Sequence, residues 1–344
     1  MEYGAAHTNG LYTYPAASGT QFTDGCNAIW DLGLRCLKVY CTVDYATNYP
    51  LQTAWSSTPT TLTELCQTTQ FSTQLSRDWT SVVLTVFPFS TNVGGVSNWW
   101  RTGANNARLA LEYTELYNLT VHLLTTYNDS GTKFVLQNWE GDWAFADEFV
   151  ADSFIQRKMV DYYAAFAANR QKAIADARRV TAHKNVSVQH AFECNRVLDW
   201  KTYPHRRRIL KDIFNRVQPD IVSWSAYDGT IDGWKADQAA WLAWVRVEMP
   251  KALRLIGDAA PGVPIQIGEF GFPENEAPVT HDVSEMIEEV RDLSIEHGVE
   301  RLIYWEVFDN EPSIPYTYRG YWLIKPDGTQ SLAGVKFAEY AAGG

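Results

Sequence analysis

The sequence predicts a single α/β domain, residues 1–344, with the architecture of a (β/α)8 barrel, also called a TIM barrel. Three observations predict it. Short apolar runs typical of strands alternate with amphipathic helical stretches along the whole chain, which is the pattern of parallel βα units. Eight such strand-helix units fit within 344 residues, which leaves room for elaborated βα loops around a barrel core of roughly 250 residues. A doubly wound sheet is the alternative, but no Gly-rich GxGxxG or GxxxxGK turn follows any strand.

The elements follow from the periodicity of the apolar residues. The eight expected strands are Glu2–His7, Arg35–Cys41, Ser81–Phe87, Phe134–Trp139, Asn185–Phe192, Asp220–Ala226, Pro264–Glu269 and Arg301–Trp305. The helical periodicity predicts helices over Phe22–Leu32, Leu62–Leu75, Asn105–Leu119, Phe154–Thr181, His205–Val217, Asp237–Ile256, Val283–His297 and Leu332–Ala341.

The charge balance narrows the class of partner. Forty acidic residues against 29 Lys and Arg give a net charge of −11, which argues against nucleic acid or an anionic membrane and favours a neutral substrate. The chain also contains 14 Trp, and indoles can stack on the apolar faces of sugar rings, although most Trp residues fill cores. The Trp residues in segments that look like loops are Trp99, Trp100, Trp143, Trp200 and Trp234.

The cysteines and histidines give no pattern typical of a metal site, and no cofactor motif occurs. The five cysteines form no CxxC pair, so we expect no zinc, and one or two local disulfides are expected if the protein is exported. No apolar run is long enough to cross a membrane, and the sequence begins without a signal peptide. We therefore expect an extracellular or periplasmic protein whose leader has been removed, with a cytoplasmic one as the alternative; the oligomeric state is not predicted.

Two acids end two of the expected strands. Glu269 follows Ile265 and Ile267 with a period of two, so we expect these three side chains to share the inward face, with Glu269 at the rim. The same parity groups Glu140 with Leu136 and Asn138, and Asp142 is its rival two residues further on. A buried charge is costly unless it is paired or used, and two carboxylates at one rim are typical of glycoside hydrolysis.

Other strand ends supply candidate substrate-binding residues. Tyr227 is expected to hydrogen-bond a nucleophilic carboxylate, and His190, on the face of Val186 and Val188, is expected to contact a sugar hydroxyl or an acid, or else to be a core histidine. Lys38 lies in so apolar a strand that we expect a carboxylate partner for it. Trp305 is expected to form the floor of a sugar site, and the neighbouring Glu306 is a further candidate that should point the other way.

With these residues the sequence resembles clan A of the glycoside hydrolases, retaining enzymes with a (β/α)8 barrel. The resemblance spans nearly the whole chain and includes the Glu-Phe-Gly triplet at Glu269. It implies that Glu140, at the end of strand four, is the general acid/base and that Glu269, at the end of strand seven, is the nucleophile. It also implies that Tyr227 is the partner of the nucleophile and that Trp305 is the platform under the cleaved sugar.

The chain departs from the clan's pattern at three positions. Trp139 separates Asn138 from Glu140, Lys38 stands where many members have an arginine, and Ser225 stands where some have a histidine. Trp139 therefore joins Asn138 among the candidates for substrate contact.

The expected reaction is hydrolysis of β-linked glycosides in an oligo- or polysaccharide by double displacement. The two carboxyls should then lie about 5 to 5.5 Å apart, whereas about 6.5 to 9.5 Å would indicate inversion. One alternative is a barrel that binds carbohydrate without cleaving it. A less favoured one is a metal-dependent barrel hydrolase, because the seven histidines are scattered. Residues 92–103 and 193–203 are expected to set the specificity.

Overall fold

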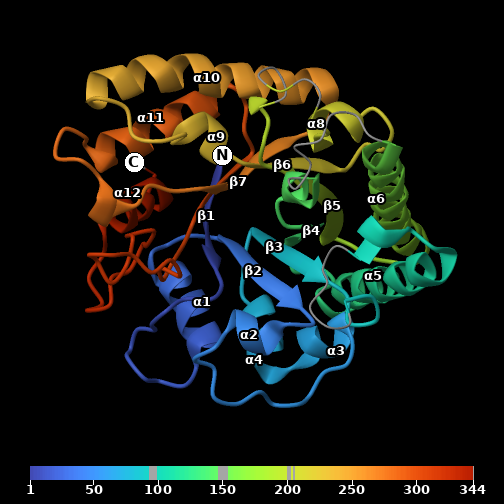
Figure 1. The fold of residues 1–344 in the computed structure, drawn as a ribbon. Helices are drawn as coiled ribbons and strands as arrows, with labels where there is room; N and C mark the ends of the chain where they lie inside the picture. Colours follow the sequence, from blue (N-terminus) through green and yellow to red (C-terminus); the bar gives the residue numbers. More distant parts are fainter. Residues whose placement is uncertain (93–98, 146–153, 200–202, 204–205, 344) are drawn as a thin grey trace.

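In the computed structural model, which describes residues 1–92, 99–145, 154–199, 203 and 206–343, the chain forms a closed barrel of eight parallel strands (Figure 1). The strands lie in sequence order and β8 pairs with β1, which closes the cylinder. Their bounds are β1 Glu2–His7, β2 Cys36–Thr42, β3 Ser81–Phe87, β4 Lys133–Gln137, β5 Ser187–Cys194, β6 Ile221–Ser225, β7 Ile265–Phe270 and β8 Arg301–Tyr304. The predicted fold class and all eight strands are confirmed.

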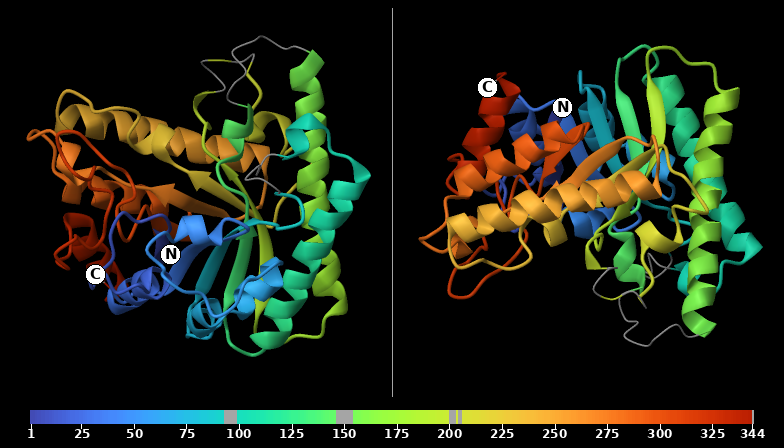
Figure 2. Two further views of the ribbon diagram at one scale, coloured as in Figure 1. Left: turned by 60° about the horizontal axis from the view of Figure 1, so that its bottom comes forward. Right: turned by 90° about the horizontal axis from the view of Figure 1, so that it is seen from above.

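Helices surround the barrel, and the two views of Figure 2 show the long helices α6, in green, and α10, in yellow to orange, on different sides of it. No helix within the described ranges has the length and apolarity needed to cross a bilayer. The helix bounds are α1 Gln21–Asp31, α2 Tyr45–Asn48, α3 Leu62–Gln67, α4 Thr69–Leu75, α5 Asn106–Thr126, α6 Phe154–Val180, α8 Ile209–Asp212, α9 Tyr227–Thr230, α10 Gln238–Ala259, α11 Val283–Glu296 and α12 Leu332–Ala341. Short 3-10 helices span Trp99–Thr102, Gly141–Phe145 and Glu274–Glu276.

Two predicted helices differ from the structure. The stretch Leu62–Leu75 is divided into α3 and α4, because Thr68 adopts an extended ψ of 148° and its hydroxyl caps the backbone N–H of Phe71. The predicted helix His205–Val217 is reduced to α8, which begins after the extended residue Arg208; residues 204 and 205 lie outside the described part.

The residues inside the barrel form layers along its axis. A small apolar cluster of Cys36, Val83, Val135, Ala191, Ile221 and Ile303 is separate from the large core between the strands and the helices. Because side chains alternate across a strand, the residues two positions further on also point inward, and on β2 to β6 they are polar: Lys38, Thr85, Gln137, Glu193 and Ser223. This polar layer lies directly beneath the carboxyl ends of the strands.

The expected local disulfides are absent, since all five cysteines are buried free thiols. Cys41 and Cys66 come within 3.6 Å of each other through their sulfur atoms. Burial raises the pKa of the Cys41 thiol, and the neighbouring Cys66 raises it further.

Candidate active site

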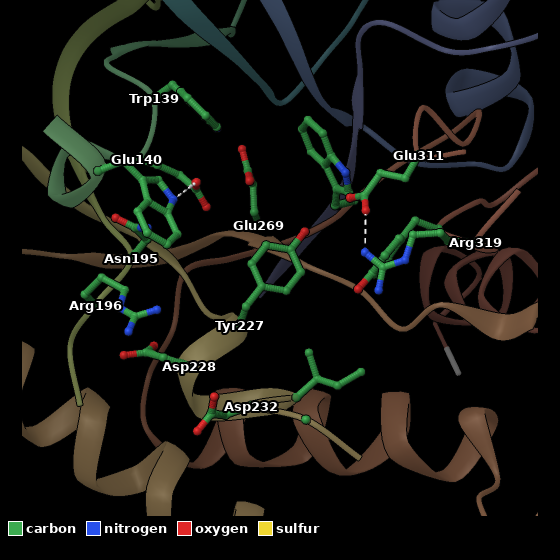
Figure 3. A pocket seen from close by; sticks show the side chains of 15 residues that line it. Trp139, Glu140, Asn195, Arg196, Tyr227, Asp228, Asp232, Glu269, Glu311 and Arg319 are labelled. Carbon is green, nitrogen blue, oxygen red and sulfur yellow. Dashed lines mark hydrogen bonds and ion pairs between the residues drawn. The ribbon is translucent and has the colours of Figure 1, made fainter. Parts of the chain in front are cut away.

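A pocket with a cavity volume of about 430 Å³ opens at the carboxyl ends of the strands, and both predicted acids line it (Figure 3). Its walls come from the segments that follow strands β4 to β8. In a (β/α)8 barrel this end of the cylinder carries the active site. We call this cavity the catalytic pocket.

Glu140 and Glu269 face each other across the hydroxyl of Ser225. The Ser225 Oγ lies 2.6 Å from Oε1 of Glu140 and 3.4 Å from Oε2 of Glu269. These two carboxyl oxygens are therefore at most about 6 Å apart, so both acids can contact one bound molecule. The side chains of both acids are largely buried, with relative exposures of 9% and 2% for the two residues.

Glu140 reaches the pocket through a turn and not through the alternation of strand β4. Val135 and Gln137 are the inward residues of that strand, while Leu136 packs outward in the large core, so the predicted shared face with Leu136 is wrong. The strand ends at Gln137, and Glu140 has a φ of 27°, in the left-handed region. Its backbone N–H donates to Oε2 of Glu193 at 2.8 Å, which holds this turn in place.

The side chain of Glu140 is fixed by two donors. The indole N–H of Trp143 donates to its Oε2 at 2.5 Å, and the Ser225 hydroxyl is the second donor. Trp143 is 45% exposed and lines the pocket, so its ring is available to a ligand. Asp142, the rival acid, is buried and accepts backbone N–H groups from Asn195, Arg196 and Ile209, which gives it a role in holding the loop.

Glu269 points inward because strand β7 has an irregularity. Gln266 is the inward residue lower on the strand, where it bonds to Gln137 and Ser223, and Ile267 packs outward. The register with β6 shifts after Ile267, so that Glu269 pairs with Ser225. The predicted common face of Ile265, Ile267 and Glu269 is therefore wrong, although the predicted position of Glu269 in the site is right.

Gly268 permits this arrangement. A Cβ atom at this position would lie 2.0 Å from Oγ of Ser223 and 2.8 Å from Oε1 of Glu193. Only a residue without a side chain fits between these groups. The carbonyl of Gly268 also accepts a hydrogen bond from Lys38 at 3.0 Å.

Lys38 joins two carboxylates beneath the pocket. Its Nζ lies 2.7 Å from Oε1 of Glu269 and 3.1 Å from Oε1 of Glu193, and the side chains of Lys38 and Glu193 are fully buried. The carboxylate partner predicted for Lys38 is thus present. Burial disfavours the ammonium, but the two carboxylates raise the pKa of Lys38 above its ordinary value, so it stays charged.

Several site residues were not predicted from the sequence: Ser225, Arg196, Glu311, Arg319 and, most central among them, Glu193. Besides Lys38 and the backbone of Glu140, its carboxylate accepts from Nε2 of Gln137 at 2.9 Å and Oγ of Ser223 at 3.1 Å. The sequence signal that could have found it was an acid near the end of strand β5, two residues after the inward-facing Ala191. The prediction assigned the inward face of β5 to the wrong set of alternate residues, so it selected His190 instead of Glu193.

Burial sets the titration of the two acids. It raises the pKa of Glu140 to about 7; the Ser225 hydrogen bond opposes this rise and the negative charge of Glu193 adds to it. Burial also raises the pKa of Glu269, and the Lys38 ammonium opposes that rise. Since the two carboxyls are close and buried, the ionisation of one raises the pKa of the other.

Three of the predicted substrate-binding residues line the pocket: Trp139, Tyr227 and Trp305. Trp139 is 43% exposed at the rim, and Trp305 packs against Tyr40 and Tyr321 beside Glu269. Tyr227 was expected to hydrogen-bond Glu269, but within the described residues the hydrogen bonds to that carboxylate come from Lys38 and Ser225. Figure 3 shows the Tyr227 ring in the middle of the pocket, near Glu269.

Three other predicted residues are not brought into the pocket. His190 lies on the outer face of β5, where its Nδ1 is 3.0 Å from Oε1 of Gln171 in helix α6, and burial lowers its pKa well below the usual value. The amide of Asn138 bonds to the backbone of Glu193 at 3.2 Å instead of facing a ligand. Glu306 is fully buried, accepts the backbone N–H of Thr8 and does not line the pocket; strand β8 ends at Tyr304, so the alternation expected for Trp305 and Glu306 does not apply.

The tryptophans in the expected loops have different positions. Trp99 and Trp100 are buried, and Trp100 packs edge-on against Tyr163, so they fill core. Trp143 contributes to the catalytic pocket, Trp234 packs against His281, and Trp200 lies outside the described residues.

On the opposite wall from Glu140, Arg319 is held by acidic partners. It pairs with Glu276 at 3.0 Å and with Glu311 at 2.5 Å, and its guanidinium lies over the ring of Tyr321 at 5.1 Å. Figure 3 shows Glu311 and Arg319 together on this side. The described residues include no group of three or more His, Cys, Asp or Glu side chains arranged to hold a metal ion.

Comparisons with known proteins agree with this architecture. No protein-family model matches the chain, and no curated protein matches it. Among solved structures, it is similar to a GH5_18 protein from Bifidobacterium longum subsp. infantis, with a TM-score of 0.61, 15% identity, and coverage of 100% of this chain and 79% of that one.

Two further structures are similar. An exo-beta-1,4-mannosidase from Opitutaceae bacterium strain TAV5 gives a TM-score of 0.58 at 13% identity, covering 100% of this chain and 59% of that one. A GH5-4 broad specificity endoglucanase from Bacteroides salanitronis gives 0.53 at 13% identity, covering 99% of this chain and 92% of that one. At these identities the likeness establishes the (β/α)8 fold that the chain has in common with these glycoside hydrolases.

Proposed function

We propose that this protein is a retaining glycoside hydrolase that cleaves β-linked glycosides of an oligo- or polysaccharide. The observation that carries the proposal is the pair Glu140 and Glu269, two buried acids in one pocket at the carboxyl end of the barrel, with a carboxyl oxygen of each within about 6 Å of the other. Exposed indoles at the rim, Trp139 and Trp143, give the pocket surfaces suited to sugar rings.

In the first step Glu269 attacks the anomeric carbon, and the bond to the leaving oxygen breaks. The Lys38 ammonium, 2.7 Å from Oε1 of Glu269, favours the anion on Glu269, so the proton of the pair resides on Glu140. With a pKa of about 7, Glu140 is able to donate this proton to the departing oxygen at neutral pH.

In the second step Glu140, now ionised, takes a proton from a water molecule, and the oxygen of that water attacks the same carbon. The ester bond to Glu269 breaks and the sugar is released with its original configuration. Ser225 stabilises both steps, because its hydroxyl lies between the two carboxyls and can donate to whichever is charged.

The similar structures suggest which substrates to test. Two of them are described as complexes with Manb1-4GlcNAc, one as an exo-beta-1,4-mannosidase and one as an endoglucanase. We therefore choose a panel of aryl β-mannosides and β-glucosides together with β-1,4-linked manno- and gluco-oligosaccharides.

The test is hydrolysis of this panel by the wild-type protein and by Glu269→Gln, with the anomer of the first product identified by proton NMR. The proposal predicts cleavage of at least one β-glycoside with retained configuration, and loss of that cleavage in the variant. Inverted product, or equal activity of the variant, would contradict it. An oligosaccharide that binds the wild-type protein and stays intact would favour a carbohydrate-binding protein without catalysis.

A further inference from the structure

A second pocket adjoins the catalytic one. It also has a volume of about 430 Å³, and it is lined by Leu198 after strand β5 and by Trp244, Glu248 and Lys251 of helix α10. We call this cavity the outer pocket. Arg196, Asp228 and Asp232 line both cavities, so the two are neighbouring parts of one depression.

The shared wall lies on the side of Glu140. The guanidinium of Arg196 lies over the Trp143 ring at 5.4 Å, and the Trp143 indole donates to Glu140 at 2.5 Å. Figure 3 shows Arg196, Asp228 and Asp232 on the side away from Glu311 and Arg319. A leaving group protonated by Glu140 must lie next to that carboxyl, on the side of the pocket that Trp143 and Arg196 line.

Hydrogen bonds to Asp228 hold the wall between the cavities. The carboxyl of Asp228 accepts the backbone N–H of Leu198 at 2.8 Å and the indole N–H of Trp224 at 3.1 Å. These bonds tie the segment after β5 to the end of β6. A wall that is already in place loses little conformational entropy when a ligand binds.

The lining suits a neutral sugar chain. The half-buried Trp244 offers an indole, and the Lys235 ammonium lies over its ring, 4.2 Å from the ring centroid. Two carboxylates around it are paired within the protein, Asp199 with Arg196, Arg206 and Arg208, and Glu248 with Lys251. Burial raises the pKa of Asp228 to about 7. A lining whose charges are largely paired offers hydrogen-bonding groups to hydroxyls but little unpaired charge to an ionised sugar, so the surroundings favour uncharged units.

We propose that the outer pocket binds the second sugar unit on the leaving-group side of a neutral β-linked oligosaccharide. This inference depends on the proposed function, because Glu140 as the acid defines which side is the leaving side. It goes beyond that function in stating that the enzyme acts on chains with at least two units beyond the cleaved bond, and acts poorly on simple glycosides.

The test measures kcat/KM for an aryl β-glycoside and for oligosaccharides of two to five units of the preferred sugar. In the wild-type protein we expect a gain of about tenfold or more when the second leaving unit is added, the effect of one good stacking contact. Trp244→Ala should lose most of this gain, and Glu248→Ala, at a partly exposed position, should reduce it. Trp30→Ala serves as the control, because Trp30 packs against Trp79 and lines neither pocket, and it should keep the wild-type ratio of long to short substrates.

The outcomes separate this inference from the proposed function. If the protein cleaves glycosides but shows no gain with chain length, or if Trp244→Ala slows all substrates equally, the outer pocket is not a subsite. Calorimetric titration of the same oligosaccharides completes the test. If nothing is cleaved but the affinity for an oligosaccharide falls in Trp244→Ala, the outer pocket is supported and hydrolysis is refuted; if nothing binds, both are refuted.

Discussion

Glu193 holds the backbone of Glu140: its Oε2 accepts the N–H of Glu140 at 2.8 Å, while its Oε1 lies 3.1 Å from the Lys38 ammonium that binds Glu269. One buried carboxylate thus contacts both halves of the proposed catalytic pair. Its negative charge also raises the pKa of Glu140. We therefore expect Glu193 to set both the position and the titration of the acid.

Glu193→Gln tests this role through the pH dependence of kcat/KM. Glu140 must be protonated to act, so activity falls as pH rises through its pKa of about 7. Removing the charge of Glu193 should move this alkaline limb to lower pH and, through misplacement, reduce kcat by about 10²-fold. Ser225→Ala should move the limb the other way, because the Ser225 hydrogen bond lowers the pKa of Glu140. If the alkaline limbs of the two variants moved in the same direction, the roles of Glu193 and Ser225 in setting the pKa of Glu140 would be refuted.

Lys38→Met should destabilise the protein. It leaves the buried carboxylates of Glu193 and Glu269 without their cation, and breaking a buried pair costs about 3 to 5 kcal/mol. The matched control is Lys133→Met, whose ion pair with Glu2 is half exposed and should contribute less than about 1 kcal/mol. Urea unfolding measures both, and an equal loss in the two variants would contradict the burial argument.

Glu140→Ala should separate substrates by the quality of their leaving group. Without the acid, a glycoside with a poor alkyl leaving group should lose about 10² to 10⁴ in rate, whereas the attack step on a dinitrophenyl glycoside needs little proton donation. Added azide should restore turnover of the dinitrophenyl substrate by replacing the base-assisted water. A uniform loss on both substrates without azide rescue would assign Glu140 a role other than acid/base.

Gly268→Ala should lower both stability and activity. The new Cβ would be 2.0 Å from Oγ of Ser223, and forcing a methyl group into a packed interior costs about 1 to 3 kcal/mol. The control is Gly257→Ala in helix α10, where a Cβ meets nothing within 4 Å and helix propensity favours alanine by about 1 kcal/mol. Thermal unfolding should therefore shift in opposite directions for the two variants, and a stable, active Gly268→Ala would refute the packing argument.

The sequence predicted the barrel well because each strand and most helices have a strong local periodicity. It predicted the locations of Glu140 and Glu269 for a reason that was only partly right, since the inward residues of β4 and β7 are Gln137 and Gln266. The turn at Glu140 and the register shift at Gly268 bring the two acids inward, and strand parity cannot reveal either. Strand β5 has no such irregularity before its end. The same wrong choice of inward face therefore selected His190, which lies on the outer face, instead of Glu193.

Helix ends and buried polar contacts are the other features that the sequence could not predict. Thr68 divides one predicted helix because its hydroxyl competes for the backbone, which a pattern of apolar residues does not record. The partner of Lys38 could be predicted as a carboxylate, but not as the two carboxylates of Glu193 and Glu269, 155 and 231 residues away in the chain.

The most direct test of the central claim is to trap the covalent intermediate. A dinitrophenyl 2-deoxy-2-fluoro-β-glycoside of the preferred sugar reacts with the nucleophile of a retaining enzyme, and the fluorine slows release of the sugar. The labelled protein, digested and sequenced by mass spectrometry, should carry a single fluorosugar on Glu269, with rapid release of one equivalent of dinitrophenol. A label on another residue, or hydrolysis of the natural substrate without any trapped adduct and with inverted configuration, would contradict the account.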